Sequence, residues 1–125
     1  MRILILGNPL VEIDSLPLRI LDRLKENFPK IIFQEFDPTE NLESFGRNLI
    51  IIDSAICLME VKLIQDLDQI YDEKKFSMHD YDLGINLKLL KKLHLIDSIK
   101  IIAIPSTYSE EKAFLEVSKI ISSLS

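Results

Sequence analysis

Two aspartates and one histidine are the residues of this chain whose types and positions could do chemistry together. Asp14 closes the segment after the first apolar run, Asp53 ends the most apolar run, and His79 stands just ahead of a helical segment. Two carboxylates and one imidazole form an O,O,N donor set that suits a borderline divalent ion such as nickel or zinc. Such a set leaves coordination positions open for water or substrate.

Each of these residues also has an ordinary structural interpretation. Asp14 could cap the first helix, Asp53 could occupy the turn after a strand, and His79 could be an exposed histidine at a helix start. His94 lies late in a helical segment, where we expect it to interact with the helix dipole. Cys57 follows a strand in an apolar context, so we expect a small buried hydrophobe there.

Short β-prone runs alternate with helical runs along the chain. Strands are expected over residues 2–6, 31–36, 48–53, 61–64 and 99–104, the last one stopped by Pro105. Helices are expected from Leu16, over a turn at 40–45 closed by Gly46, after His79, and from Ser109 onward. This alternation favours an α/β fold: a three-layer sandwich with a twisted, mostly parallel central sheet of about five strands and helices on both faces.

The helical segments have further expected features. Ser15 or Asp14 would cap the first helix, with Pro17 in its first turn. The helix after His79 would present one apolar face made of Leu83, Leu87, Leu90 and Leu93. The C-terminal helix would carry an apolar stripe made of Ala113, Phe114, Val117, Ile120, Ile121 and Leu124. Residues 66–78 are polar and irregular, which predicts a surface loop.

The placement of these elements brings the three candidate ligands together. Open α/β sheets bind ligands at the carboxyl ends of their strands. Residues 7–14 and 53–55 each follow a strand, and residues 77–80 lead into the central helix. We therefore expect Asp14, Asp53 and His79 to converge on one edge of the sheet.

Composition limits the class of protein. The 125 residues, 47% of them hydrophobic, suit one domain over 1–125 with a core of its own, and the single cysteine excludes an internal disulfide. The net charge of −5 and the lack of a Lys/Arg cluster argue against nucleic acid as a partner. The N-terminal apolar run is too short for a signal peptide or membrane span, so we expect a soluble, cytoplasmic protein. No long exposed apolar stretch demands a dimer, so we expect a monomer.

Three segments, in order, resemble the motifs of the [NiFe] hydrogenase maturation endopeptidases. The strand running into Gly7-Asn8-Pro9-Leu10, with Asp14 after it, resembles the family's opening motif. The apolar strand ending in Asp53-Ser54-Ala55 is similar to its second motif, and Ser77-Met78-His79-Asp80, followed by Leu83-Gly84, is similar to its third. The strand that ends near Pro105 resembles the family's last strand, so the resemblance covers nearly the whole chain.

This resemblance implies both an activity and a site. It implies removal of a C-terminal extension from a hydrogenase large-subunit precursor after nickel insertion, by an aspartic-type or metal-dependent endopeptidase. Asp14, Asp53 and His79 would contact the metal and carry the catalysis. The nickel would be presented by the precursor, and other divalent ions such as zinc or cadmium could occupy the same position.

Two other interpretations stay open at the level of sequence. The first acidic position of the family's opening motif is Ile13 here, and Glu12, Ser15 and Pro17 replace small or glycine positions around it. A non-cleaving relative that checks nickel or binds the precursor as a chaperone would also fit these changes. The Gly7-Asn8 turn could instead bind a small nucleotide, although the glycine spacing of a nucleotide fingerprint is absent.

Overall fold

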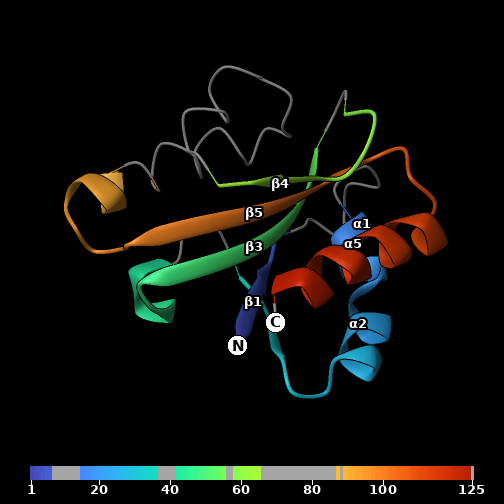
Figure 1. Ribbon diagram of the computed structural model, residues 1–125, viewed down its shortest axis with the longest axis horizontal. Coiled ribbons are helices and arrows are strands. Elements are labelled where there is room, and N and C mark those ends of the chain that lie inside the picture. Colours follow the sequence, from blue (N-terminus) through green and yellow to red (C-terminus); the bar gives the residue numbers. More distant parts are fainter. Residues whose placement is uncertain (7–14, 37–41, 56–57, 66–86, 88, 125) are drawn as a thin grey trace.

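The computed structural model describes residues 1–6, 15–36, 42–55, 58–65, 87 and 89–124. Their helices and strands follow one another in an α/β order (Figure 1). In chain order they are β1 (Arg2–Ile5), α1 (Leu16–Arg19), α2 (Leu21–Asn27), β2 (Ile32–Glu35), the 3₁₀ helix η2 (Leu42–Phe45), β3 (Asn48–Ala55), β4 (Lys62–Ile64), β5 (Ser98–Pro105) and α5 (Glu110–Leu124).

These strands form one five-stranded sheet in the order β2-β1-β3-β5-β4. The first four are mutually parallel, and β4 runs antiparallel along the outer edge of β5. The longest ladder joins β3 to β5, from the pair Asn48–Ser98 to the pair Ala55–Pro105. The mostly parallel sheet expected from the sequence is confirmed, with the antiparallel strand confined to an edge.

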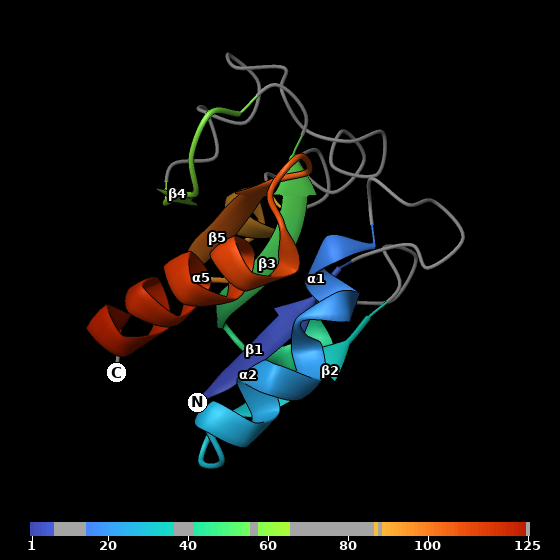
Figure 2. The same ribbon diagram turned by 90° about the vertical axis from the view of Figure 1, so that its right-hand side faces the viewer.

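Side chains from both faces of the sheet are buried. The helices α1, α2 and α5 cover one face (Figure 2), where Ile3 and Ile5 of β1 join their apolar side chains. Leu4 and Leu6 point to the other face and join a second core cluster with η2 and with Leu87 and Leu90. Burial on two faces explains why the strands are almost continuously apolar in sequence.

The first helical segment differs from the single helix expected from Leu16. It divides into α1 and α2 at Ile20, whose carbonyl accepts the Leu24 N–H at 3.0 Å and so starts the second helix. Pro17 lies in the first turn of α1 as expected, because its missing N–H costs nothing there. Ser15 occupies the N-cap position, but its side chain makes no cap hydrogen bond to the described helix.

The C-terminal helix agrees with its predicted stripe. Ala113, Phe114, Val117 and Ile121 are buried against the sheet, while Ile120 and Leu124 are partly buried. The Ser109 hydroxyl accepts the Lys112 N–H at 3.2 Å and caps the first turn of α5. None of the helices in the described ranges is long and apolar enough to cross a membrane.

The helix ahead of β5 ends one residue earlier than its leucine pattern suggested. Residues 89–92, together with Leu87, are helical, and the chain then turns at His94, which has a φ of 61°. The N–H of Leu95 bonds to the Leu90 carbonyl, and the N–H of His94 bonds to the Lys91 carbonyl, which is a Schellman motif. Leu93 was expected on the apolar face of this helix, but it lies in the turn beyond the helix end and is 57% exposed.

Candidate functional site

The carboxyl end of β3 carries the one predicted site residue that the structure describes. Asp53 lies within the strand, not after it, because pairing with β5 continues for two more residues to Ala55. The interpretation of Asp53 as an ordinary turn residue is therefore wrong. Its side chain shares a sheet face with Leu49 and Ile51, which belong to the core, and the residue is only 2% exposed.

The two carboxylate oxygens of Asp53 have different surroundings. Oδ1 accepts the backbone N–H of Ser54 at 2.8 Å, which fixes the orientation of the group. Oδ2 is fully buried and accepts no hydrogen bond from any described residue. A buried polar atom without a partner costs about 1–3 kcal/mol, and a metal-binding or catalytic role is one reason for a protein to keep such an atom. Oδ2 therefore has an acceptor capacity that the described residues do not use.

The other two predicted ligands, Asp14 and His79, lie outside the described residues, as do Cys57, residues 7–14 and residues 66–78. Within the part of the chain that the structure describes, no three His, Cys, Asp or Glu side chains gather into a metal cluster. The three-ligand set therefore stays a prediction of the sequence. Of the three predicted ligands, Asp53 is the one whose position in the fold the structure describes.

His94 does not belong to this site. It precedes β5, whereas Asp53 pairs with Ala103 near the far end of that strand. We expected His94 to lie late in a helix, but it lies in the turn beyond the helix end, so its expected position is wrong. Its carbonyl accepts a hydrogen bond from Arg47 at 2.6 Å instead.

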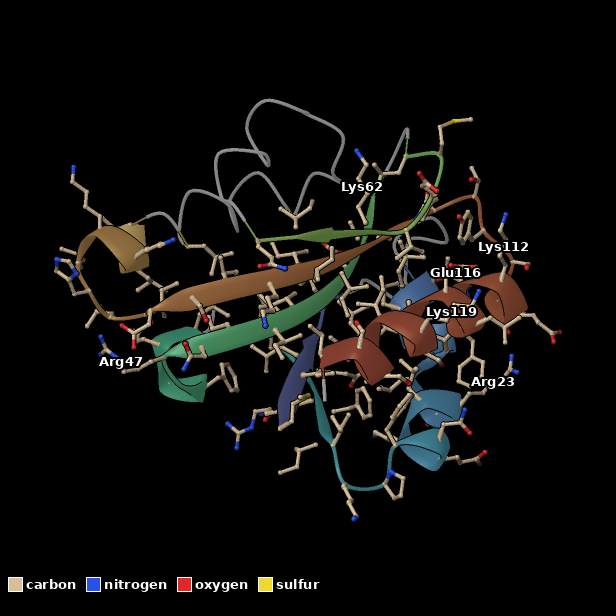
Figure 3. All side chains as sticks on the ribbon, viewed as in Figure 1. Arg23, Arg47, Lys62, Lys112, Glu116 and Lys119 are labelled. Atoms are coloured by element: carbon tan, nitrogen blue, oxygen red, sulfur yellow. The ribbon has the colours of Figure 1, made fainter. Side chains whose placement is uncertain are left out.

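Sequence reasoning missed one cation near Asp53. The register pairs Ala103 of β5 with Asp53 on one side and with Lys62 of β4 on the other. Side chains at paired positions emerge on the same face, so the small Ala103 separates the lysine from the carboxylate. Two strand spacings put their backbones roughly 10 Å apart. Figure 3 shows Lys62 at the carboxyl end of the sheet. Only pairing across β5 reveals this proximity.

Comparison with known proteins places this site in a known fold. No model of a protein family matches the sequence, and no curated protein matches it. Solved structures do match over nearly the whole chain. The [NiFe] hydrogenase maturation protease HybD from Thermococcus kodakarensis is 21% identical, with a TM-score of 0.68 and 99% of each chain covered. The hydrogenase maturating endopeptidase HybD from E. coli is 18% identical, with a TM-score of 0.65, covering 99% of this chain and 92% of that one.

The chain has the fold of the hydrogenase maturation proteases. An uncharacterized protein from Wolinella succinogenes has the same fold, at 14% identity and a TM-score of 0.61, with 99% of this chain and 98% of that one covered. The resemblance drawn from three short motifs is thus confirmed at the level of fold. In this maturation-protease fold, Asp53 lies at the sheet edge where α/β proteins bind their ligands.

Proposed function

We propose that this protein is an endopeptidase that removes the C-terminal extension of a [NiFe] hydrogenase large-subunit precursor once nickel has been inserted. The observation that carries the proposal is the buried Oδ2 atom of Asp53, which no described residue satisfies, at the carboxyl edge of this fold. Two proteins that share the fold over nearly their whole length are named as hydrogenase maturation proteases. The motif order in the sequence supports the same activity.

Asp53 is suited to recognising a metal ion carried by the substrate. Oδ1 accepts the hydrogen bond from the Ser54 N–H that orients the carboxylate. Binding of the precursor's nickel to Oδ2 would leave this hydrogen bond in place. The strand on which it sits is paired on both sides, which holds the group in place before the substrate arrives. Asp14 and His79 complete the proposed contact set.

Binding of this kind would fix the precursor's C-terminal segment beside the site. Alignment of a scissile bond with its nucleophile contributes several kcal/mol to a rate acceleration. A site carboxylate accepts a proton from the water that attacks the scissile carbonyl, which is ordinary general-base chemistry. Zinc or cadmium would occupy the same O,O,N set in vitro.

A second candidate is a non-cleaving protein that binds the nickel-loaded precursor. The feature that favours it is Ile13, an apolar residue where the family's opening motif has its first acid. Such a protein would keep Asp53 for metal recognition and lack the full proton-transfer machinery. Stable complex formation without a change in precursor mass distinguishes it from the peptidase.

The test is a processing assay with large-subunit precursor from the same cell, with and without nickel, followed by intact mass. We expect nickel-dependent loss of a C-terminal peptide with the unaltered chain. Asp53→Asn should slow it at least about a hundredfold, because the variant keeps the shape and the Ser54 hydrogen bond but loses the anionic ligand. Asp22→Asn, an identical change at an exposed site on α2, is the matched control and should process normally.

Either of two results would count against the proposal. Normal processing by Asp53→Asn would remove Asp53 from the site, and the absence of cleavage with every loaded precursor would favour the non-cleaving alternative. Size-exclusion chromatography and cell fractionation would test two further parts of the proposal, a monomeric state and a cytoplasmic location.

A further inference from the structure

A pocket opens at the amino ends of β1 and β3, the end of the sheet opposite Asp53. It has a volume of about 290 Å³. Its described lining consists of Arg2 and Leu4 from β1, Phe45 at the end of η2, Arg47, and residues 48–50 at the start of β3. Figure 1 shows η2 beside the first residues of β3, and Figure 3 shows Arg47 at the same end of the sheet.

The pocket exists because β1 and β3 separate toward their amino ends. Their ladder contains only the pairs Leu4–Ile51 and Ile5–Ile52, although β3 begins three residues before Ile51. Residues 48 and 49 at the start of β3 therefore have no ladder partner on β1. Arg2 and Leu4 lie on the same face of β1, the one that points toward η2. Both side chains therefore line the pocket.

The polar side chains of this pocket are positively charged or neutral. Arg2 and Arg47 are its charged members, and no Asp or Glu belongs to its described lining. This is unusual in a chain with 20 acidic and 15 basic residues. The half-buried Phe45 supplies an apolar surface beside the two guanidinium groups, whereas Leu4 and Leu49 also line the pocket but are almost fully buried.

Arg47 is held in position by its neighbours. Its Nε and Nη2 donate to the two carboxylate oxygens of Asp97, each at 3.0 Å, and Nη2 also donates to the His94 carbonyl. Asp97 offsets the charge of Arg47, whereas no described carboxylate pairs with Arg2, so among the described residues Arg2 supplies the excess positive charge of the pocket.

We propose that this pocket binds a small monocarboxylate that carries an apolar group. A guanidinium and a carboxylate match in geometry and charge, which makes arginine a preferred carboxylate ligand. One guanidinium without a carboxylate partner among the described residues suits one negative charge, and the acidic surface of the chain disfavours polyanions. Phe45 offers an apolar surface for the hydrocarbon part, and the volume is close to the lower limit for ligand pockets.

This site is separate from the proposed processing site and does not depend on the proposed function. Asn48 and Asp53 are five residues apart on β3, which corresponds to roughly 17 Å along a strand. Loss of carboxylate binding would leave the peptidase proposal untouched, and the converse also holds.

The experiment is a titration of the full chain with 3-phenylpropionate, followed by backbone amide chemical shifts and by calorimetry. We expect saturable shifts of the amides of Arg2, Phe45 and residues 47–50. The uncharged amide, 3-phenylpropionamide, should bind at least about tenfold more weakly, because it loses the charge-assisted hydrogen bonds. Inorganic phosphate, an anion without an apolar group, should also bind at least about tenfold more weakly.

One variant and its matched control test whether Arg2 binds the carboxylate. Arg2→Gln should weaken binding at least about tenfold, because it removes the excess charge. Arg23→Gln makes the same change on α2, where Arg23 stacks 4.2 Å from the Phe114 ring centroid, and should leave binding unchanged. Figure 3 shows Arg23 and Arg47 on opposite sides of the molecule.

Three results would each overturn the proposal. They are the absence of saturable shifts in the pocket, equal binding of the acid and its amide, and phosphate binding as tight as that of phenylpropionate. The comparison of acid with amide uses the unaltered protein, so it decides the matter even if Arg2→Gln does not fold.

Discussion

Replacement of Asp53 by asparagine should make the protein more stable while it removes processing. The residue is 2% exposed, and its Oδ2 accepts no hydrogen bond from the described part of the chain. Burial of a charge without a partner costs several kcal/mol, whereas a buried neutral amide donor without a partner costs about 1–3 kcal/mol. Asparagine also keeps the acceptor for the Ser54 N–H. We expect the free energy of unfolding to rise by about 1 kcal/mol.

Urea unfolding at pH 8, followed by circular dichroism, measures this change directly. A gain of about 1 kcal/mol corresponds to a rise in melting temperature of roughly 4 °C for a chain of this size. Asp22→Asn should change the free energy of unfolding by less than about 0.5 kcal/mol, because that side chain is exposed. Stabilisation upon removal of a site residue is the known trade-off between stability and activity.

The opposite result would refute this reasoning. If Asp53→Asn lowers the free energy of unfolding by 1 kcal/mol or more, the carboxylate is satisfied in the folded protein. Oδ2 would then have a partner in the folded protein and would not be free to bind a metal. The central observation behind the proposed function would be lost.

Two further predictions concern the turn before β5. His94→Gly should raise the free energy of unfolding by about 1 kcal/mol in urea, because the φ of 61° strains every residue with a Cβ; His94→Ala is the control, and equal stability of the two variants would contradict the strain. A hydrogen bond from Arg47 lowers the pKa of Asp97, so this contribution to stability is present above the ordinary value of 3.8 and is lost as pH falls through the lowered pKa. Asp97→Asn should therefore be less stable than the unaltered chain at pH 7 and equally stable in strong acid, and a deficit that persists in acid would show another cause.

The sequence predicted the class of fold and the position in it of one candidate site residue. Apolar runs of four to eight residues, separated by segments with helical spacing, indicated strands buried on two faces and hence a mostly parallel sheet. Asp53 could be placed at the carboxyl edge because it follows four apolar residues of β3. The local sequence is enough to predict these strands because a strand that is buried on both faces has apolar residues at nearly every position.

Strand lengths could not be predicted in the same way. The strand expected to end at Asp53 continues to Ala55, and the one expected to stop before Pro105 includes it. Each extension is stabilised by the other strand, since Ala55 pairs with Pro105. A proline without an N–H is tolerated there because it is the last residue of the ladder. Pairing between residues fifty positions apart leaves no local signal.

Tertiary structure alone decided which polar groups lack partners and which lie together. The sequence shows that Asp53 is an acid after an apolar run, but the packing around β3 determines that Oδ1 is bonded and that no described residue satisfies Oδ2. It shows Arg2 and Arg47 as separate basic residues, but the separation of β1 from β3 brings both into one pocket. Both outcomes depend on distances between strands that are remote in sequence, and the type and spacing of residues do not encode such distances.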